Sequence, residues 1–282
     1  MTTAMSPAIN GVQSRRAADA LCIDLIRREL TAETVGFEIH LFREVASTND
    51  ALRPLAAAGA REGTAVLAES QRGGRGRLGK AWFSPEGVNL YASVLFRPKL
   101  SPRAVPVFCF IASLALADAI AAAGVPAGVR WPNDVMVGGR KVAGTLSAVA
   151  MTRHVVDSVI LGVGVNLNVS REALERGLGE AADFATSLRE SVGHPIDRNH
   201  FAASFLNHLE HWFDVYAARG LGAILVAWKD RDVLRGHVVE VRAGAATYRG
   251  RVAGVDDEGR LVLEQGPAAE RIVVCGEIAP VD

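Results

Sequence analysis

The chain has 282 residues, which is enough for one large domain with a small second one. Its 49% hydrophobic and 22% charged residues are typical of an ordinary soluble globular protein. The 31 basic residues balance 31 acidic ones, so no global field favours nucleic acid or an anionic membrane. Cys22, Cys109 and Cys275 lie too far apart to indicate a disulfide framework or a metal site. Residues 1–10 lack the blocks of a signal peptide, and a cytoplasmic location is expected.

The amino-terminal residues 1–37 are expected to form a separate, mostly helical extension, with one helix over residues 15–30. This length is about half of what a winged-helix DNA-binding domain needs, so DNA binding is not expected. From residue 38 the pattern alternates like a half-buried strand over residues 39–43. Ser47 or Thr48 can then cap a helix that runs to about residue 58.

Residues 38–232 are expected to form the main domain, in which strands and helices are mixed. Gly138 and Gly139 mark a hairpin turn between two of the strands. The expected strands after the first are residues 64–68, 88–96, 128–131, 135–137, 141–150 and 155–168. The expected helices are residues 107–123, 198–218 and 221–230.

One apolar segment, residues 104–129, is long enough to cross a bilayer. Pro106, Asp118, Gly124 and Pro126 interrupt it, and much of the remainder is weakly hydrophobic alanine. The segment therefore predicts a buried amphipathic helix over residues 107–123, and no membrane association is expected.

Residues 233–282 change to short strands with a turn at Asp257-Glu258-Gly259, which predicts a small β-barrel. The fold class expected for the whole chain is α+β, with a mixed β-sheet flanked by helices and a compact all-β tail.

The most informative segment is the basic loop, residues 71–82, which has four cations among four glycines and no acidic residue. Glycine lets the backbone approach a ligand closely, and crowded cations favour an anion between them. One alternative is a solvated surface loop. A P-loop is a second alternative, but Ala81 stands where the magnesium-binding hydroxyl belongs, and Pro85 prevents the phosphate-binding helix. The loop is therefore predicted to close over a phosphate or an activated carboxylate.

Four further motifs stand in a fixed order around the basic loop, and each alone is a weak signal. They are Ser47-Thr48-Asn49, Arg130-Trp131-Pro132-Asn133-Asp134, Lys141-Val142-Ala143-Gly144 and Gly162-Val163-Gly164-Val165-Asn166-Leu167-Asn168. The last is not a dinucleotide fingerprint, because Leu167 occupies the place of the third glycine.

Taken together, these motifs resemble the biotin protein ligase family, in its monofunctional type without a DNA-binding domain. The resemblance covers residues 44–168 and returns at 185–188 and at Gly276-Glu277. It implies a catalytic domain of the class II synthetase-like, biotin–lipoate ligase type, followed by an SH3-like β-barrel. It also implies that biotin and ATP react to give biotinyl-5′-AMP, and that biotin is passed to a lysine of a biotin carboxyl carrier protein. A lipoate–protein ligase remains the alternative.

The resemblance also implies roles for individual residues. The implied catalytic residues are Arg77, Lys141 and Asp134. The implied biotin-binding residues are Ser47, Thr48, Asn49, Gln71, Gly74, Arg75, Gly76, Arg77, Lys141 and Gly144. The implied ATP-binding residues are Arg75, Arg77, Lys80, Trp82, Arg130, Asn133, Lys141, Asn166 and Phe184. Mg²⁺ is expected on the ATP phosphates, with no protein-only metal site.

Some assignments keep an alternative. Asp134 either accepts the proton of the acceptor lysine or only caps the turn after Pro132. Arg130 and Lys80 exchange the cation type that is usual in the family, and Ala148 replaces a residue that is often acidic. Two further functional alternatives are a biotin-responsive repressor and a catalytically inactive binding protein. The chain is expected to act as a monomer or a homodimer.

Overall fold

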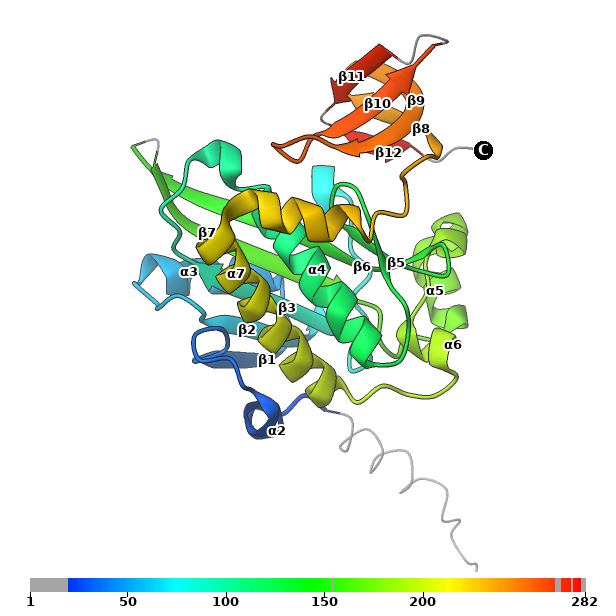
Figure 1. The fold of residues 1–282 in the computed structure, drawn as a ribbon. Helices are drawn as coiled ribbons and strands as arrows, with labels where there is room; N and C mark the ends of the chain where they lie inside the picture. Colours follow the sequence, from blue (N-terminus) through cyan, green and yellow to red (C-terminus); the bar gives the residue numbers. More distant parts are fainter. Residues whose placement is uncertain (1–19, 154, 267–269, 275, 280–282) are drawn as a thin grey trace, which may run out of the picture.

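The structure is a computed structural model that describes residues 20–153, 155–266, 270–274 and 276–279 (Figure 1). The described strands form two sheets, and the larger is a seven-stranded mixed sheet in the order β1-β2-β3-β7-β6-β5-β4. Its strands are β1 (Ile39–Val45), β2 (Ala65–Gln71), β3 (Leu90–Phe96), β4 (Gly128–Arg130), β5 (Asp134–Val137), β6 (Arg140–Thr152) and β7 (Val155–Val165). These strands confirm the expected α+β class and lie within a few residues of the expected bounds.

The strands β1 and β2 pair in parallel, and the other neighbours in this sheet pair antiparallel. A parallel pair needs a crossover connection, which helix α3 (Thr48–Ala57) supplies. The long hairpin of β6 and β7 runs from Ala143 opposite Val165 to Thr152 opposite Val155. Its register brings the Lys141 motif and the Gly162 motif onto adjacent strands.

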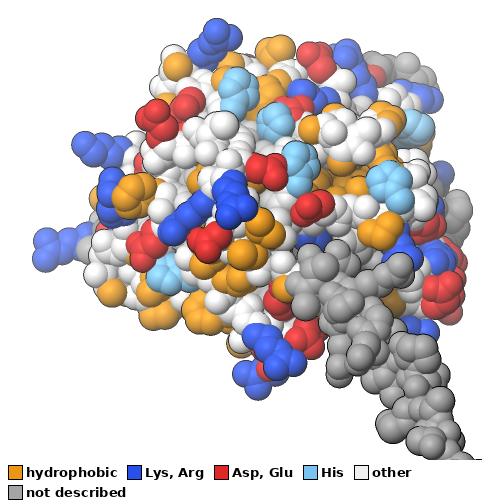
Figure 2. Space-filling model, turned by 90° about the horizontal axis from the view of Figure 1, so that it is seen from below, with side chains coloured by type: hydrophobic (Ala, Val, Ile, Leu, Met, Phe, Trp, Pro, Cys, Tyr) orange, Lys and Arg blue, Asp and Glu red, His pale blue; other side chains and the backbone are white. Residues whose placement is uncertain are grey.

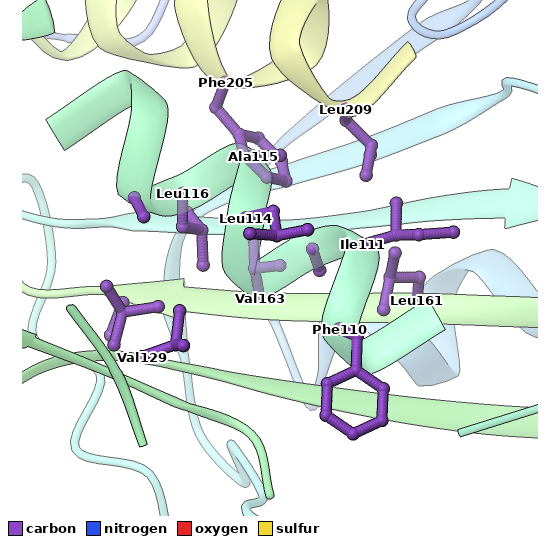
Figure 3. Close-up of a cluster of buried hydrophobic side chains, with 14 of the residues drawn as sticks. Phe110, Ile111, Leu114, Ala115, Leu116, Val129, Leu161, Val163, Phe205 and Leu209 are labelled. Atoms are coloured by element: carbon purple, nitrogen blue, oxygen red, sulfur yellow. The ribbon is translucent and has the colours of Figure 1, made fainter. Parts of the chain in front are cut away.

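Helices α4 (Val107–Ala122) and α7 (Arg198–Lys229) cover one face of the sheet, while α3 packs on the other side (Figure 1). Figure 3 shows how Ile111 and Leu114 of α4 lie between the strand residues Leu161 and Val163 and the α7 residues Phe205 and Leu209, whereas the Phe110 ring points away from Phe205 and Leu209. Because α4 is enclosed by both the sheet and α7, it carries apolar side chains nearly all round.

Among the described residues, one helical segment, Pro102–Ala122, is long and apolar enough to cross a membrane. However, 72% of its apolar window is buried inside the protein. The prediction of a buried helix at this segment is confirmed, but the expected amphipathic character is wrong, because α4 is packed on several sides and has no polar face.

Two expected helices, residues 198–218 and 221–230, follow one another in α7, which is kinked at Gly220, where φ is +71°. At the amino-terminal end, the expectation of one helix over residues 15–30 is wrong for the part that the structure describes. Helix α2 spans only Ile23–Glu29, and Cys22 before it is extended with φ −139°. Residues 15–19 lie outside the described residues.

The smaller sheet has five strands in the order β11-β10-β9-β8-β12, all paired antiparallel. Its strands are β8 (Val238–Ala243), β9 (Ala246–Val255), β10 (Leu261–Gln265), β11 (Glu270–Val274) and β12 (Glu277–Ala279). It stands above the larger sheet in Figure 1 and is consistent with the expected SH3-like unit. The buried Trp131 fixes one contact between the two units, since its Nε1 donates to the Gly259 carbonyl oxygen at 3.0 Å.

Some elements have no counterpart in the sequence-based expectations. They are the short helices α5 (Arg171–Leu178) and α6 (Leu188–Val192), the 3-10 helix η3 (Gly179–Phe184) and strand β12. On the molecular face shown in Figure 2, cationic and anionic side chains are interspersed, in keeping with the equal numbers of both.

Candidate active site

The candidate site is a cavity of about 320 Å³ on the β6–β7 hairpin, on the side of the sheet that carries α3. It gathers all five motifs of the sequence analysis. The implied site residues that line it are Ser47, Thr48, Asn49, Gln71, Arg75, Gly76, Arg77, Lys80, Trp82, Arg130, Asn133, Asp134, Lys141, Gly144, Asn166 and Phe184. Of the implied residues, only Gly74 is not part of the lining. Gly74 lies behind it, where an added Cβ would come within 2.7 Å of Ser84 Oγ.

Three glycines of the hairpin form the floor of the cavity. An added Cβ on Gly164 would lie 2.4 Å from Trp82 Nε1, and one on Gly162 would lie 2.4 Å from Asn49 Oδ1. Gly144 is opposite Gly164 in the strand register, and its added Cβ would meet Trp82 at 3.3 Å. Side chains at these positions would fill the space that Trp82 and Asn49 occupy. The glycines are therefore required by close approach.

One end of the cavity is built from hydroxyl and amide groups at the start of α3. The Gln71 Oε1 accepts the backbone N–H of Thr48 at 2.9 Å. Ser47 is the N-cap residue of α3, one of the two expected positions, but its hydroxyl makes no capping hydrogen bond, and Gln71 satisfies this end of the helix instead. Ser93, which the sequence analysis did not single out, is fully buried, and its Oγ lies 2.7 Å from Thr48 Oγ1 and 2.6 Å from Asn49 Oδ1. These groups can satisfy a ligand with both N–H and C=O groups.

A cluster of three charges lies beside the floor. Asp134 Oδ1 is 2.5 Å from Lys141 Nζ, and Asp134 Oδ2 is 2.7 Å from Arg130 Nη2. Burial of the Asp134 carboxyl would raise its pKa, but the adjacent Lys141 and Arg130 cations outweigh burial and lower the pKa below its usual value. Lys141 Nζ also lies 5.3 Å from the centre of the Trp82 ring. The Asp134 carboxyl is therefore ionised at neutral pH.

The basic loop is anchored at several points by its own cations. Arg75 pairs with Asp50 of α3 at 2.6 Å, and Arg72 pairs with Glu44 at 3.1 Å. Arg77 donates from Nη2 to the Gly276 carbonyl oxygen of the smaller sheet at 3.2 Å.

Arg77 has a second nitrogen, Nη1, that is buried without a hydrogen-bond partner among the described residues. A buried N–H of a cation without an acceptor is costly, and an anion in the cavity would satisfy it. The loop forms only a 3-10 turn at Arg77–Gly79, and Lys80 is extended with ψ 138°. The rejection of a P-loop is therefore confirmed, because a P-loop needs a helix at this point.

The other end of the cavity contains Asn166 and Phe184. Asn166 is 5% exposed and donates from Nδ2 to the Thr186 carbonyl oxygen at 3.0 Å, whereas Phe184 is 59% exposed. A strand advances about 3.3 Å per residue, so four residues separate Gly162 beside Asn49 from Asn166 by about 13 Å. The cavity thus has a hydroxyl and amide end, a charged middle and a second amide end.

Several residues of the cavity were not expected from the sequence. Leu174 and Leu178 of α5 and Ile278 of β12 line it. Ser187 followed by Glu190 was a readable capping-box signal for α6, and Ser187 Oγ does accept the Glu190 N–H at 3.3 Å. Ser93 and Ile278 carried no local signal, because only the long-range strand pairing brings them to the site.

Comparisons with known proteins agree with this geometry. Residues 41–166 match the model of the Biotin/lipoate A/B protein ligase family. A bifunctional ligase/repressor BirA of Bacillus spizizenii is 32% identical over 88% of this chain and 75% of its own length. A biotin--[acetyl-CoA-carboxylase] ligase of Paracoccus denitrificans is 34% identical over 76% of this chain and 88% of its own. Among solved structures, the biotin protein ligase of Aquifex aeolicus in complex with biotin and ATP superposes with a TM-score of 0.71. It is 25% identical, and the match covers 86% of this chain and 97% of that one.

Proposed function

The chain belongs to the biotin protein ligase family, and we propose how its cavity carries out the ATP-dependent attachment of biotin to a carboxylase carrier domain. In the first step, the biotin carboxylate attacks the α-phosphorus of ATP, and pyrophosphate leaves. In the second step, a lysine amine attacks the carbonyl of biotinyl-5′-AMP, and AMP leaves while the amine loses a proton.

The observation that supports this proposal best is the order of chemical groups along the cavity, which follows β7 from Gly162 toward Asn166. A ureido ring presents one carbonyl and two N–H groups, which suit the hydroxyl and amide end at Ser47, Thr48, Asn49 and Gln71. Asn166 and Phe184 at the other end suit a nucleobase. The reacting carboxylate and α-phosphate would then meet over the glycine floor, next to Lys141.

Adenylation brings a carboxylate against a triphosphate, so the residues around the floor must compensate for negative charge. We assign this role to Lys141, Arg130, Arg75, Lys80 and Arg77, all of which line the cavity. We assign the main part of this compensation to Lys141, because its ammonium lies over the glycine floor beside Gly144, where Asp134 and the Trp82 ring hold it. On binding, the substrate carboxylate competes with Asp134 for this ammonium. The unpartnered Nη1 of Arg77 is assigned to the phosphate of the intermediate.

The transfer step requires a neutral acceptor amine. Asp134 is the one carboxylate among the described residues that line the cavity, so we assign it to this step. With Lys141 and Arg130 both paired to it, its lowered pKa makes it a weak proton acceptor. Its basicity rises once Lys141 moves to the substrate. We therefore propose that Asp134 first positions Lys141 and then orients the incoming amine.

ATP-dependent ligation implies Mg²⁺, which supplies further positive charge on the phosphates. Within the described residues, no group of three or more His, Cys, Asp or Glu side chains is placed to hold a metal ion. Asp134 is engaged by two cations, and Asn133 donates its amide to the Thr145 carbonyl oxygen at 2.6 Å. These residues fit a metal carried mainly by substrate phosphates, as Mg²⁺ commonly is.

The test is isotope exchange between pyrophosphate and ATP, followed by mass spectrometry of an acceptor domain incubated with protein, ATP and biotin. Biotin-dependent exchange and one biotinylated lysine are expected. Exchange that depends on lipoate and not on biotin would support the alternative, a lipoate–protein ligase. Absence of exchange with both acids would favour an inactive binding protein.

The remaining parts of the proposal concern partners and location. We propose a biotin carboxyl carrier domain as acceptor, action in the cytoplasm, and no sequence-specific DNA binding. The balanced charge of the chain supports the last point. A mobility-shift assay with the DNA upstream of its own gene is expected to show no salt-sensitive complex. Sedimentation would decide between a monomer and a homodimer.

A further inference from the structure

A chain of buried amide groups connects β3 with the second amide end of the cavity. Asn89, fully buried just before β3, accepts the Leu167 N–H on its Oδ1 at 3.0 Å. Its Nδ2 donates to Asn166 Oδ1 at 3.4 Å, and Asn166 Nδ2 donates to the Thr186 carbonyl oxygen at 3.0 Å. Asn89 does not line the cavity, whereas Asn166 does.

This chain has a fixed direction. The Leu167 N–H can only donate, and the Thr186 carbonyl can only accept, so both ends require the same orientation of the two amides. Turning the Asn166 amide over would place its N–H₂ against the Asn89 N–H₂ and its oxygen against the Thr186 oxygen. Buried groups that face like groups are strongly disfavoured.

The peptide groups at both ends of this chain are themselves held in place. Thr186 N donates to the Lys141 carbonyl oxygen at 2.9 Å, and Arg189 N donates to the Leu167 carbonyl oxygen at 2.8 Å. The Asn89 carbonyl oxygen accepts from the buried Arg198 at 3.2 Å. The amide of Asn166 therefore cannot turn over by a small local movement.

A fixed amide distinguishes nucleobases. One lone pair of Asn166 Oδ1 and one N–H of Nδ2 are left for a ligand after the bonds to Asn89 and Thr186. Adenine offers an amino donor beside a ring-nitrogen acceptor, which matches this pair. Guanine has a carbonyl oxygen in place of the amino group, so its oxygen would face Asn166 Oδ1. An amide that was free to turn over would accept guanine equally well.

We propose that Asn89 is a positioning residue that selects adenine over guanine nucleotides by fixing the amide orientation of Asn166; this rests on the proposed function of the cavity. Asn89 acts without touching the nucleotide. Its effect is on the choice of base and not on biotin, whose assigned end of the cavity lies about 13 Å away along β7.

The experiment compares kcat/KM for ATP and GTP in biotin-dependent pyrophosphate exchange. The wild-type protein is expected to prefer ATP by roughly 10- to 100-fold, the range for one well-placed bidentate amide–base pair. Asn89→Asp puts an acceptor against Asn166 Oδ1, and Asn89→Leu removes the contact. Both variants are expected to lower the ATP preference to a few-fold while the KM for biotin changes less than about twofold.

Asn168→Asp is the matched control. Asn168 is a buried asparagine on the same segment, bonded through both amide atoms to Ile196, and it does not line the cavity. Its substitution introduces the same buried charge, so it is expected to lower stability and leave the ATP preference unchanged.

Equilibrium binding of ATP and of GTP, measured by calorimetry without biotin, separates this inference from the proposed function. ATP selectivity that depends on Asn89, with no biotin-dependent exchange, would support the inference and contradict the function. A wild-type protein that does not discriminate ATP from GTP overturns the inference. It is also overturned if either folded Asn89 variant keeps the wild-type preference.

Discussion

Arg77 differs from the other arginines of the basic loop in where its guanidinium lies. Arg72 and Arg75 are paired with carboxylates, whereas Arg77 keeps one buried N–H without a partner among the described residues. Arg77→Gly should therefore weaken retention of biotinyl-5′-AMP, because the phosphate loses a charge-assisted hydrogen bond of about 1.5–3 kcal/mol. The expected result is release of the intermediate and labelling of lysines on bystander proteins, measured by mass spectrometry.

The control for this prediction is Arg72→Gly, which makes the same change in the same loop. Arg72 pairs with Glu44 and does not line the cavity, so its loss should leave labelling confined to the acceptor lysine. If Arg77→Gly also labelled only the acceptor lysine, the assignment of Arg77 to the phosphate would be wrong.

The charge of Asp134 predicts how the free energy of unfolding depends on pH. Its pKa in the folded protein lies below the usual value of about 3.9, because the Lys141 and Arg130 cations outweigh the effect of burial. A lowered carboxyl pKa contributes stability that is complete above about pH 5 and is lost as the pH falls through the folded-state pKa. The stability difference between the wild-type protein and Asp134→Asn, measured by urea unfolding, should be constant from pH 5 to 7 and shrink below about pH 4. A difference that stays constant down to pH 3 would contradict this.

At the scale of elements, the start of α7 is tied to the sheet by a buried ion pair. Arg198 is 3% exposed and lies 2.7 Å from Glu69 of β2, whose other oxygen accepts the Leu21 N–H at 2.6 Å. Removing one partner of a buried pair costs more than the pair contributes, because the remaining charge stays desolvated. Glu69→Ala is therefore expected to lower the free energy of unfolding by about 3 kcal/mol in urea titrations.

Glu86→Ala supplies the comparison for this ion pair. Glu86 pairs with Arg43 at 2.9 Å, but both side chains are more than half exposed. Exposed pairs contribute at most about 1 kcal/mol, so this variant should unfold close to the wild-type protein. Equal losses in the two variants would show that burial does not set the strength of the Glu69–Arg198 contact.

The elements that local sequence predicted are those with a strong local signal. The apolar run of α4 and the alternating pattern of the small sheet were enough to predict a helix and strands. Gly138-Gly139 predicted the hairpin turn between β5 and β6 of the larger sheet. The helices α5 and α6 have eight and five residues, too few for a clear periodicity. The parallel pairing of β1 with β2 also had no local signal, because the α3 crossover determines it.

At the scale of the molecule, the residues of the site also divide into those with a local sequence signal and those without one. Polar groups in compact motifs, such as Lys141 or Asn166, were recognisable because the motifs together resemble a known family. Residues that act through them were not recognisable, because Asn89 and Ser93 meet their partners only after β3 pairs with β7. The smaller sheet was predicted, but not that its Gly276 and Gly259 carbonyl groups would contact the basic loop and the Trp131 turn.

These two contacts predict that the small sheet and the main domain stabilise each other through Gly259. Gly259 has φ +79°, and an added Cβ would lie 2.6 Å from the Phe110 ring of α4. Gly259→Ala therefore combines backbone strain with overpacking, and a loss of about 2–4 kcal/mol in the free energy of unfolding is expected.

Gly244→Ala separates the two effects, since Gly244 has φ +62° in the same sheet but nothing within 4 Å of an added Cβ. Backbone strain alone should cost about 1–2 kcal/mol there. Because Trp131 adjoins the Arg130–Asp134 cluster, Gly259→Ala should also raise the KM for ATP, and Gly244→Ala should not. Equal losses of stability and an unchanged KM in both variants would mean that the docking of the small sheet does not position the site.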